Sequence, residues 1–230
     1  MLIDQSPPDR LPQMLAADAR TRTNANTGTV ALSRRIAIVL IAMAINGALY
    51  LGINAFPPSK PRLLPRSLVD DWLGWQAWTI WPYWLLLLAG PALTLTIDQR
   101  RLLRATLRAY AIAIGLNATI WLLWPTRIVR PPLPQGLDAL TEAAWRCLYA
   151  LDGVNNCFPS GHITIPVVAA MGFAAQYPQM RAAVWIALAA LAPSVVSTGQ
   201  HYAWDVLGGL ATATIGLLLA GRPLWRSARA

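Results

Sequence analysis

The sequence contains little charge, little histidine and little cysteine. Of its 230 residues only 13% are charged, 2 are His and 2 are Cys, whereas 56% are hydrophobic. A soluble domain of this length normally carries about twice that share of charged residues. The apolar residues also form long runs instead of amphipathic stripes, which excludes an ordinary soluble domain and indicates an integral membrane protein.

The charge that is present is mostly positive, with a formal net charge of +9. The basic residues stand in short clusters between apolar runs, where membrane topology places them. No basic-aromatic recognition pattern accompanies them, so we expect no nucleic-acid partner. We interpret the charge as a determinant of orientation, with a secondary attraction to anionic membrane lipids.

Six apolar segments come close to the length of a membrane-spanning helix, which is about 20 residues with roughly 17 as the lower end. They cover residues 36–56, 77–97, 105–124, 162–176, 182–198 and 203–220. The fourth is short and needs Ser160 and Gly161 to complete it. The sequence therefore predicts an all-α integral membrane protein with six transmembrane helices.

The rest of the chain is expected to serve this membrane domain. In the second outward loop, LDALTEAAWRCLYAL (137–151) has apolar residues at three- and four-residue spacing, which predicts a short helix lying in the membrane interface. We expect residues 1–35 to form a disordered cytoplasmic tail, 36–221 the catalytic membrane domain, and 222–230 a basic cytoplasmic tail.

The arginines predict the orientation. One side of the predicted topology is richer in them, and the clusters on that side are Arg20, Arg22, Arg34, Arg35, Arg100, Arg101, Arg104, Arg108, Arg181, Arg222, Arg226 and Arg229. This side is expected to be cytoplasmic and to hold both termini. The localisation expected is a bacterial-type inner (plasma) membrane, with the outward loops on the periplasmic side.

The two histidines, His162 and His201, are 39 positions apart. About 20 helical residues cross the membrane and another 20 return, so both imidazoles should reach the same outer face. Asp205 follows His201 by four residues, which on a helical turn places both side chains on one face. A carboxylate there would fix the tautomer of His201 and make its other nitrogen a better nucleophile. The alternative is an interfacial His beside a helix-capping Asp.

Further polar groups precede each of these sites. Ser160 is a good N-cap for the fourth span, and Gly161 lets a ligand approach the backbone, so the start of this helix could bind an anion. Arg127 and Arg130 follow the third span on the same side. Arg binds phosphate through two hydrogen bonds, although anchoring to lipid headgroups explains Arg127 equally well.

These motifs resemble those of the type 2 phosphatidic acid phosphatases, a superfamily of lipid phosphate phosphatases and head-group transferases. The family pattern is KxxxxxxRP, PSGH and SRxxxxxHxxxD, and here RP stands at 130–131, PSGH at 159–162 and HxxxD at 201–205. Two family cations are absent, because Leu123 and Val195 occupy their positions. The stretches DGVNNCFPSGH and STGQHYAWDV look closest to the inositol-phosphoryl and sphingomyelin transferase-like branch.

The resemblance implies roles for the site residues. His201 would attack the phosphorus of a lipid phosphoester and form a phosphohistidine, with Asp205 orienting it. His162 would protonate the leaving oxygen and then activate water or an alcohol. Arg130, Ser160 and Gly161 would hold the phosphoryl oxygens, and Arg127 could partly replace the missing cations. Neither a cofactor nor a metal is expected, since no cluster has metal-ligand spacing.

Three function classes remain open on the sequence. They are a hydrolase with water as acceptor, a transferase with an alcohol as acceptor, and a non-enzymatic membrane protein with degenerate motifs. The expected partners are a lipid phosphate substrate and membrane lipids, and the sequence does not determine the oligomeric state. Cys147 and Cys157 share the second outward loop, where they could form a disulfide or remain free thiols.

Overall fold

A computed structural model describes residues 28–133, 135–221 and 224. Most of the predicted N-terminal tail, residues 1–27, lies outside the described residues, and so does most of the segment 222–230. The first predicted span is a helix that begins at Leu32, a few residues earlier than expected.

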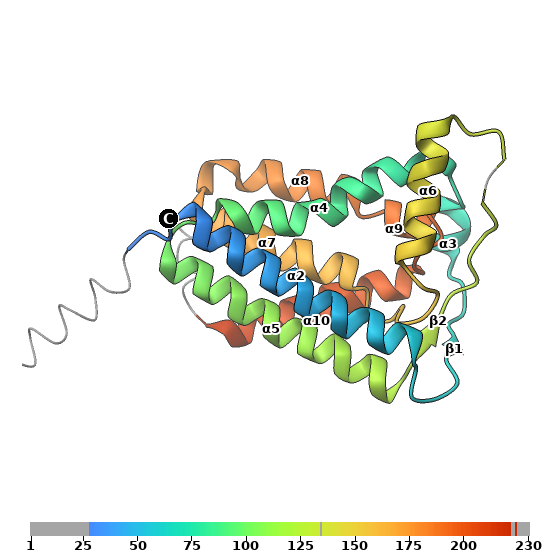
Figure 1. The fold of residues 1–230 in the computed structure, drawn as a ribbon, viewed down its shortest axis with the longest axis horizontal. Helices are drawn as coiled ribbons and strands as arrows, with labels where there is room; N and C mark the ends of the chain where they lie inside the picture. Colours follow the sequence, from blue (N-terminus) through green and yellow to red (C-terminus); the bar gives the residue numbers. More distant parts are fainter. Residues whose placement is uncertain (1–27, 134, 222–223, 225–230) are drawn as a thin grey trace, which may run out of the picture.

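Long helices run side by side along the molecule (Figure 1). The bundle consists of α2 (Leu32–Ala55), η1 (Ala77–Thr79) leading into α4 (Ile80–Thr96), α5 (Arg100–Leu123), α7 (Gly161–Gln176), η2 (Pro178–Met180) leading into α8 (Arg181–Leu191), and α10 (Ala203–Ala220). Within the described residues, five helical segments are long and apolar enough to cross a membrane: Leu32–Ala55, Ala77–Thr96, Arg100–Leu123, Pro178–Ser197 and Ala203–Ala220.

The fourth predicted span is shorter than a membrane-crossing helix. Helix α7 has 16 residues, which rise about 24 Å, whereas the hydrocarbon core of a bilayer is about 30 Å thick. The structure therefore supports a multi-pass membrane protein with five spans by length, and the predicted count of six is not confirmed.

The fifth predicted span is not one regular helix. Helix α8 ends at Leu191, and a separate helix, α9 (Ser194–Ser197), begins after Pro193. Proline cannot donate the backbone hydrogen bond that would continue the first helix, which explains the break. The residues that follow the break, up to His201, are thereby released to form part of the site.

The loops that the sequence predicts to face outward gather at one end of the bundle (Figure 1). This end holds β1 (Arg62–Leu63), α3 (Leu68–Leu73), β2 (Thr126–Arg127), α6 (Ala139–Leu151) and α9. Strands β1 and β2 pair in parallel, with Arg62 opposite Thr126. Helix α6 corresponds to the helix predicted in the second outward loop, and Asp138 caps it by accepting hydrogen bonds from the backbone N–H groups of Leu140 and Thr141.

Small residues allow α5, α7 and α10 to pack closely. A Cβ on Gly216 of α10 would lie 2.6 Å from the carbonyl oxygen of Ala109 in α5, and one on Gly209 would lie 2.5 Å from the carbonyl oxygen of Ser160 at the start of α7. Close backbone approach at small residues is a typical way for membrane helices to associate. The missing side chain at Gly209 thus allows the start of α7 to pack directly against the backbone of α10.

A buried polar cluster joins the same three helices. The side-chain amide of Asn117 in α5 donates to the Thr164 hydroxyl of α7 at 3.0 Å, and Thr164 lies 3.1 Å from the Thr212 hydroxyl of α10. Thr164 also donates to the Ser160 carbonyl at 2.9 Å. The Asn117 side-chain oxygen has no partner within the described residues, but the hydrogen bonds that are formed favour one arrangement of the three packed helices. The cluster therefore supports the helix start that carries His162.

Candidate active site

The imidazoles of His162 and His201 lie in direct contact at the loop end of the bundle. His162 Nδ1 is 2.9 Å from His201 Nε2, and the ring centroids are 5.1 Å apart. His162 belongs to the first turn of α7, whereas His201 lies just before α10. The helical hairpin between them returns the chain to the same end of the molecule, as their separation in the sequence predicts.

His201 is buried and is held on both sides. Its Nδ1 is 3.3 Å from Asp205 Oδ2, and its backbone N–H donates to the carbonyl of Val195 at 3.0 Å. The same Asp205 oxygen accepts the backbone N–H of Tyr202 at 2.8 Å, close to the beginning of α10. A proton on Nδ1 would point at this carboxylate and leave an unprotonated Nε2 facing His162, which is the arrangement that a nitrogen nucleophile requires.

The start of α7 is attached to the His201–Asp205 pair through the backbone. The N–H of Ser160 donates to the carbonyl of Asp205 at 2.9 Å. Ser160 is fully buried, and its hydroxyl has no hydrogen-bond partner within the described residues. The first N–H groups of a helix also lack intrahelical acceptors. Ser160 and the amides of Gly161 and His162 therefore offer donors to an anion beside the two imidazoles.

Arg130 lies over this site with most of its donors engaged. Its guanidinium donates to the carbonyls of Asp152 and Gly153 at 2.8 and 2.9 Å, and to the Gln200 side chain at 2.7 Å. It also stacks 4.5 Å above the ring of Tyr149. Gln200 directly precedes His201, so Arg130 connects the loop before α7 to the segment that carries His201.

The positions of the two absent family cations differ in character. Leu123 ends α5 and is 80% exposed, whereas Val195 is fully buried and contributes its carbonyl to His201. Arg127 is exposed in β2, and its described interactions are backbone pairing with Leu63 and Asn155. No described interaction links the Arg127 side chain to either histidine, so its predicted role in phosphate binding stays a prediction.

An acidic and phenolic cluster on the other side of His162 was not predicted. Asp152 Oδ2 lies 3.9 Å from His162 Nε2. The hydroxyl of Tyr50 in α2 donates to Asp152 Oδ1 at 2.6 Å, and the hydroxyl of Tyr83 in α4 lies 3.5 Å from Asp152 Oδ2 and 3.4 Å from His162 Nε2. Each histidine thus faces a carboxylate on the side opposite to its histidine partner.

Only part of this cluster left a signal in the sequence. Asp152 begins DGVNNCFPSGH, the stretch that ends in His162, so an acid near the histidine could have been noticed. Tyr50 and Tyr83 belong to separate spans, 102 and 69 residues from Asp152. No short-range pattern connects them, because only the packing of α2 and α4 around α7 brings them together.

Both cysteines are free in the structure, so the alternative of a disulfide is not realised. Cys147 is exposed, whereas Cys157 is buried and donates through its thiol to the Val154 carbonyl at 3.3 Å. Burial, with the negative charges of Asp205 and Asp152, raises the pKa of the Cys157 thiol well above its usual value. This thiol therefore stays protonated at neutral pH.

Among residues 28–133, 135–221 and 224, one potential metal-ligand group is assembled that the sequence spacing did not indicate. Ligand atoms of Cys157, His201 and Asp205 lie within 4.8 Å of one another. His201 and Asp205 already hydrogen-bond each other in this group, and the Cys157 thiol donates to the Val154 carbonyl. The three residues as they stand form a hydrogen-bonded His–Asp pair with a neighbouring thiol.

Comparison with known proteins was made against families, curated proteins and solved structures. The family model described as the PAP2 superfamily matches residues 106–227, more than half of the chain. No curated protein and no solved structure matches. The matched region contains His162, His201, Asp205 and Arg130. The chain therefore belongs to the PAP2 superfamily, and this membership indicates a membrane-embedded phosphatase or phosphotransferase that acts on phosphate esters.

Proposed function

We propose that the protein is a metal-independent lipid phosphate phosphatase or phosphotransferase that works through a phosphohistidine on His201. The observation that carries the proposal is the continuous chain from Asp205 to His201 to His162, with atoms 3.3 and 2.9 Å apart. A nucleophile, the group that orients it and an acid–base group are thus within hydrogen-bond distance of one another, as nucleophilic catalysis requires.

In the first step, His201 Nε2 attacks phosphorus and the bond from phosphorus to the lipid oxygen breaks. The lipid oxygen leaves with a proton from the His162 imidazolium, so a neutral alcohol is released. Because the two rings touch in the structure, His162 must rotate aside for the phosphoryl group to reach His201. Asp205 stabilises the positive charge that develops on His201 as the N–P bond forms.

In the second step, neutral His162 takes a proton from water or an alcohol, and the resulting oxygen nucleophile attacks the phosphohistidine. The N–P bond breaks, His201 is regenerated, and His162 is again protonated for the next turnover. Water yields free phosphate from a monoester. An alcohol yields a new phosphoester, which is the head-group transferase alternative, with inositol-phosphoryl transfer as one example.

The phosphoryl oxygens would be bound by donors that the fold gathers beside the histidines. The Ser160 hydroxyl is buried without a described partner. Gly161 is the first residue of α7, so its backbone N–H has no acceptor within the helix. Arg130, which hydrogen-bonds the Gln200 side chain next to His201, would supply positive charge. The hydrophobic residues at Leu123 and Val195 favour the transferase alternative, because phosphodiester donors carry less charge than the monoesters that the two family cations would neutralise.

We further propose that six helices cross a bacterial-type inner membrane and that the site lies on the periplasmic side. The five spans of sufficient length are then joined by the shorter helix α7, which is the fourth span along the chain. The start of α2 and the end of α10 lie at the bundle end opposite to the site (Figure 1), which supports a common side for both termini. Cys147 is exposed and Cys157 is buried. A membrane-impermeant maleimide should therefore label Cys147 from outside in intact spheroplasts. Labelling only after lysis would mean that Cys147 faces the cytoplasm and would contradict the proposed orientation.

The enzymatic test uses purified protein in detergent with several lipid phosphates, with and without candidate alcohols. Free phosphate identifies a hydrolase, and a new phosphoester identifies a transferase. His201→Ala should abolish either product, whereas Asp71→Asn, at an exposed carboxylate paired with Arg66, should not. Turnover retained by His201→Ala would remove the mechanism, and no product from any lipid phosphate would favour a non-enzymatic role.

A further inference from the structure

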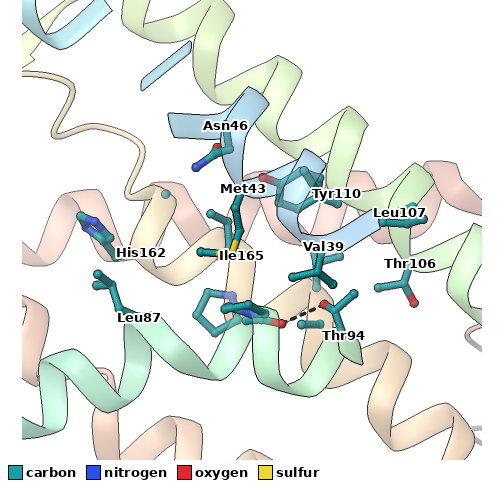
Figure 2. Close-up of a pocket in the computed structure, with 17 residues that line it drawn as sticks. Val39, Met43, Asn46, Leu87, Thr94, Thr106, Leu107, Tyr110, His162 and Ile165 are labelled. Carbon is teal, nitrogen blue, oxygen red and sulfur yellow. Dashed lines mark hydrogen bonds between the residues drawn. The ribbon is translucent and has the colours of Figure 1, made fainter. Parts of the chain in front are cut away.

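A cavity of about 220 Å³ lies inside the bundle, between α2, α4, α5 and α7. Figure 2 shows it extending from His162 at one end toward Thr94 and Thr106 at the other. Gly161 and His162 both line it, so it opens directly onto the proposed active site. Its wall follows α7 from His162 to Ala169, a helical rise of about 10 Å.

The walls of this cavity are mostly hydrocarbon, with Asn46 and Tyr110 as polar exceptions; the Asn46 side-chain oxygen is buried without a hydrogen-bond partner within the described residues. Val39, Leu87 and Ile165 are typical of the lining. The hydroxyls of Thr94 and Thr106 donate to the carbonyls of Gly90 and Leu102 in their own helices, at 2.8 and 2.9 Å. Their polar atoms are thereby satisfied within the helices. Most of the wall therefore offers no hydrogen bond to water, which needs several polar partners to be held in a cavity.

The α2 side of the cavity borders the membrane. Among the residues of α2, only Val39, Ile53 and Asn54 are buried. Met43 lines the cavity and is nevertheless 50% exposed. Because Met43 both lines the cavity and is exposed at the outer surface, the cavity offers a lipid chain a lateral route from the bilayer into the bundle beside α2.

From this geometry we propose that the cavity binds one hydrocarbon chain of the substrate while its phosphate is held at His162 and His201. The proposal rests on the function proposed above and narrows the substrate to a lipid phosphate with a long, flexible chain close to the phosphoester. One chain fills the cavity, and a second chain of a two-chain lipid remains in the bilayer.

The cavity acts on the reaction by positioning. Lipid tails are as apolar as its walls, so moving a chain from bilayer to cavity supplies little hydrophobic driving force. The bound chain instead fixes where the phosphoester lies relative to His201, which lowers the entropic part of the barrier. Its effect should therefore appear in kcat/KM for long-chain substrates and be absent for esters without a chain.

The kinetic experiment compares Ala42→Trp, which fills the cavity, with Ala44→Trp, two positions along on the exposed face of α2. The substrates are a long-chain lipid phosphate and a short, water-soluble phosphoester. We expect Ala42→Trp to lower kcat/KM at least about tenfold for the long chain and to leave the short ester within about threefold. Ala44→Trp should change neither. Equal effects of Ala42→Trp on both substrates, or no effect on either, overturn the proposal.

A binding experiment keeps the proposal testable if Ala42→Trp fails to fold. A long-chain alkyl phosphate with a diazirine at the chain end is photolysed with the wild-type protein and with His201→Ala. We expect cross-links near Thr106 and Tyr110, competed by a long-chain lipid phosphate and not by phosphatidylcholine. Equal competition by both lipids means that ordinary membrane lipid occupies the cavity, which contradicts the proposal.

The two proposals fail in different ways. If no phosphoester is turned over and yet phosphate-dependent cross-linking is observed, the chain site stands without the catalytic function. If turnover depends on His201 and neither experiment shows chain dependence, the catalytic function stands and the chain site is rejected.

Discussion

Replacing Asp152 by Asn should slow the formation of the phosphoenzyme. Asp152 Oδ2 lies 3.9 Å from His162 Nε2, and both side chains are largely buried. The carboxylate stabilises the protonated form of His162, which is the form that donates a proton to the leaving lipid oxygen. Asp152→Asn keeps the shape of the side chain and the backbone carbonyl that binds Arg130; it removes the charge and replaces one of the two acceptor oxygens with an NH₂ group.

The size of the effect follows from the separation of the charges. Two unit charges about 4 Å apart attract by about 4 kcal/mol at an effective dielectric constant near 20. Because each 1.36 kcal/mol corresponds to about tenfold in rate, the upper value is about a thousandfold. The Asn side-chain oxygen retains part of the attraction, so we expect a fall in kcat/KM between about tenfold and a thousandfold.

The assay measures kcat/KM with two phosphoesters that share a chain and differ in leaving group. With an alkyl leaving group the loss should be full, whereas an activated aryl ester, which needs no proton, should lose less than about threefold. Tyr50→Phe, which removes the 2.6 Å hydrogen bond to Asp152 Oδ1, should give a smaller loss of about tenfold with the alkyl ester.

A purely structural role for Asp152 would give a different pattern. Loss of folding or of site geometry would slow both esters equally and would lower the melting temperature. Equal losses for the two esters, or an alkyl-ester activity within about threefold of wild type, would refute the role assigned to the carboxylate.

Three further predictions follow from the same geometry. Arg130→Ala should lower kcat/KM at least about a hundredfold, since it removes charge-assisted hydrogen bonds, whereas Arg127→Ala should cost less than about threefold; the reverse order would move the phosphate site. Gly209→Ala should destabilise the protein by about 1–3 kcal/mol in thermal unfolding, because its Cβ would lie 2.5 Å from the backbone carbonyl of Ser160. Gly115→Ala, whose Cβ would meet nothing within 4 Å, is the control and should not destabilise it. Equal stability of the two variants would disprove the close contact at Gly209. Chelation with EDTA and the Cys157→Ser substitution should both leave turnover intact, and activity lost to EDTA and restored by zinc would indicate a metal site.

The sequence predicts the bounds of a helix well where the thickness of the bilayer determines how many apolar residues the helix needs. The apolar runs at 203–220 and 77–97 correspond closely to Ala203–Ala220 and Ala77–Thr96, because a run of that length has few alternatives to a helix in a membrane. The contact between His162 and His201 also follows from a length, the distance needed to cross the membrane and return. Helix α7 departs from the expected span length because it has only 16 residues. Its first turn carries His162 and belongs to the candidate site.

Contacts between distant spans could not be derived in this way. Tyr50 and Tyr83 face Asp152 because α2 and α4 pack beside α7, and a single sequence contains no periodicity that reports such packing. The Cys157–His201–Asp205 group likewise arises from tertiary packing. Cys157 lies in the loop before α7, and that loop contacts the start of α10 through the hydrogen bond from Ser160 to Asp205. The cavity beside His162 depends on how loosely α2 packs, which composition does not reveal.

The most direct test of the account is to trap the phosphoenzyme. Wild-type protein and His162→Ala are mixed with a lipid substrate carrying radioactive phosphate, quenched in alkali and digested, and the labelled peptide is sequenced. We predict an acid-labile, alkali-stable phosphoryl group on His201, absent in His201→Ala, where no nucleophile remains. Label on any other residue, or turnover of substrate with no covalent label under single-turnover conditions, would contradict the central claim.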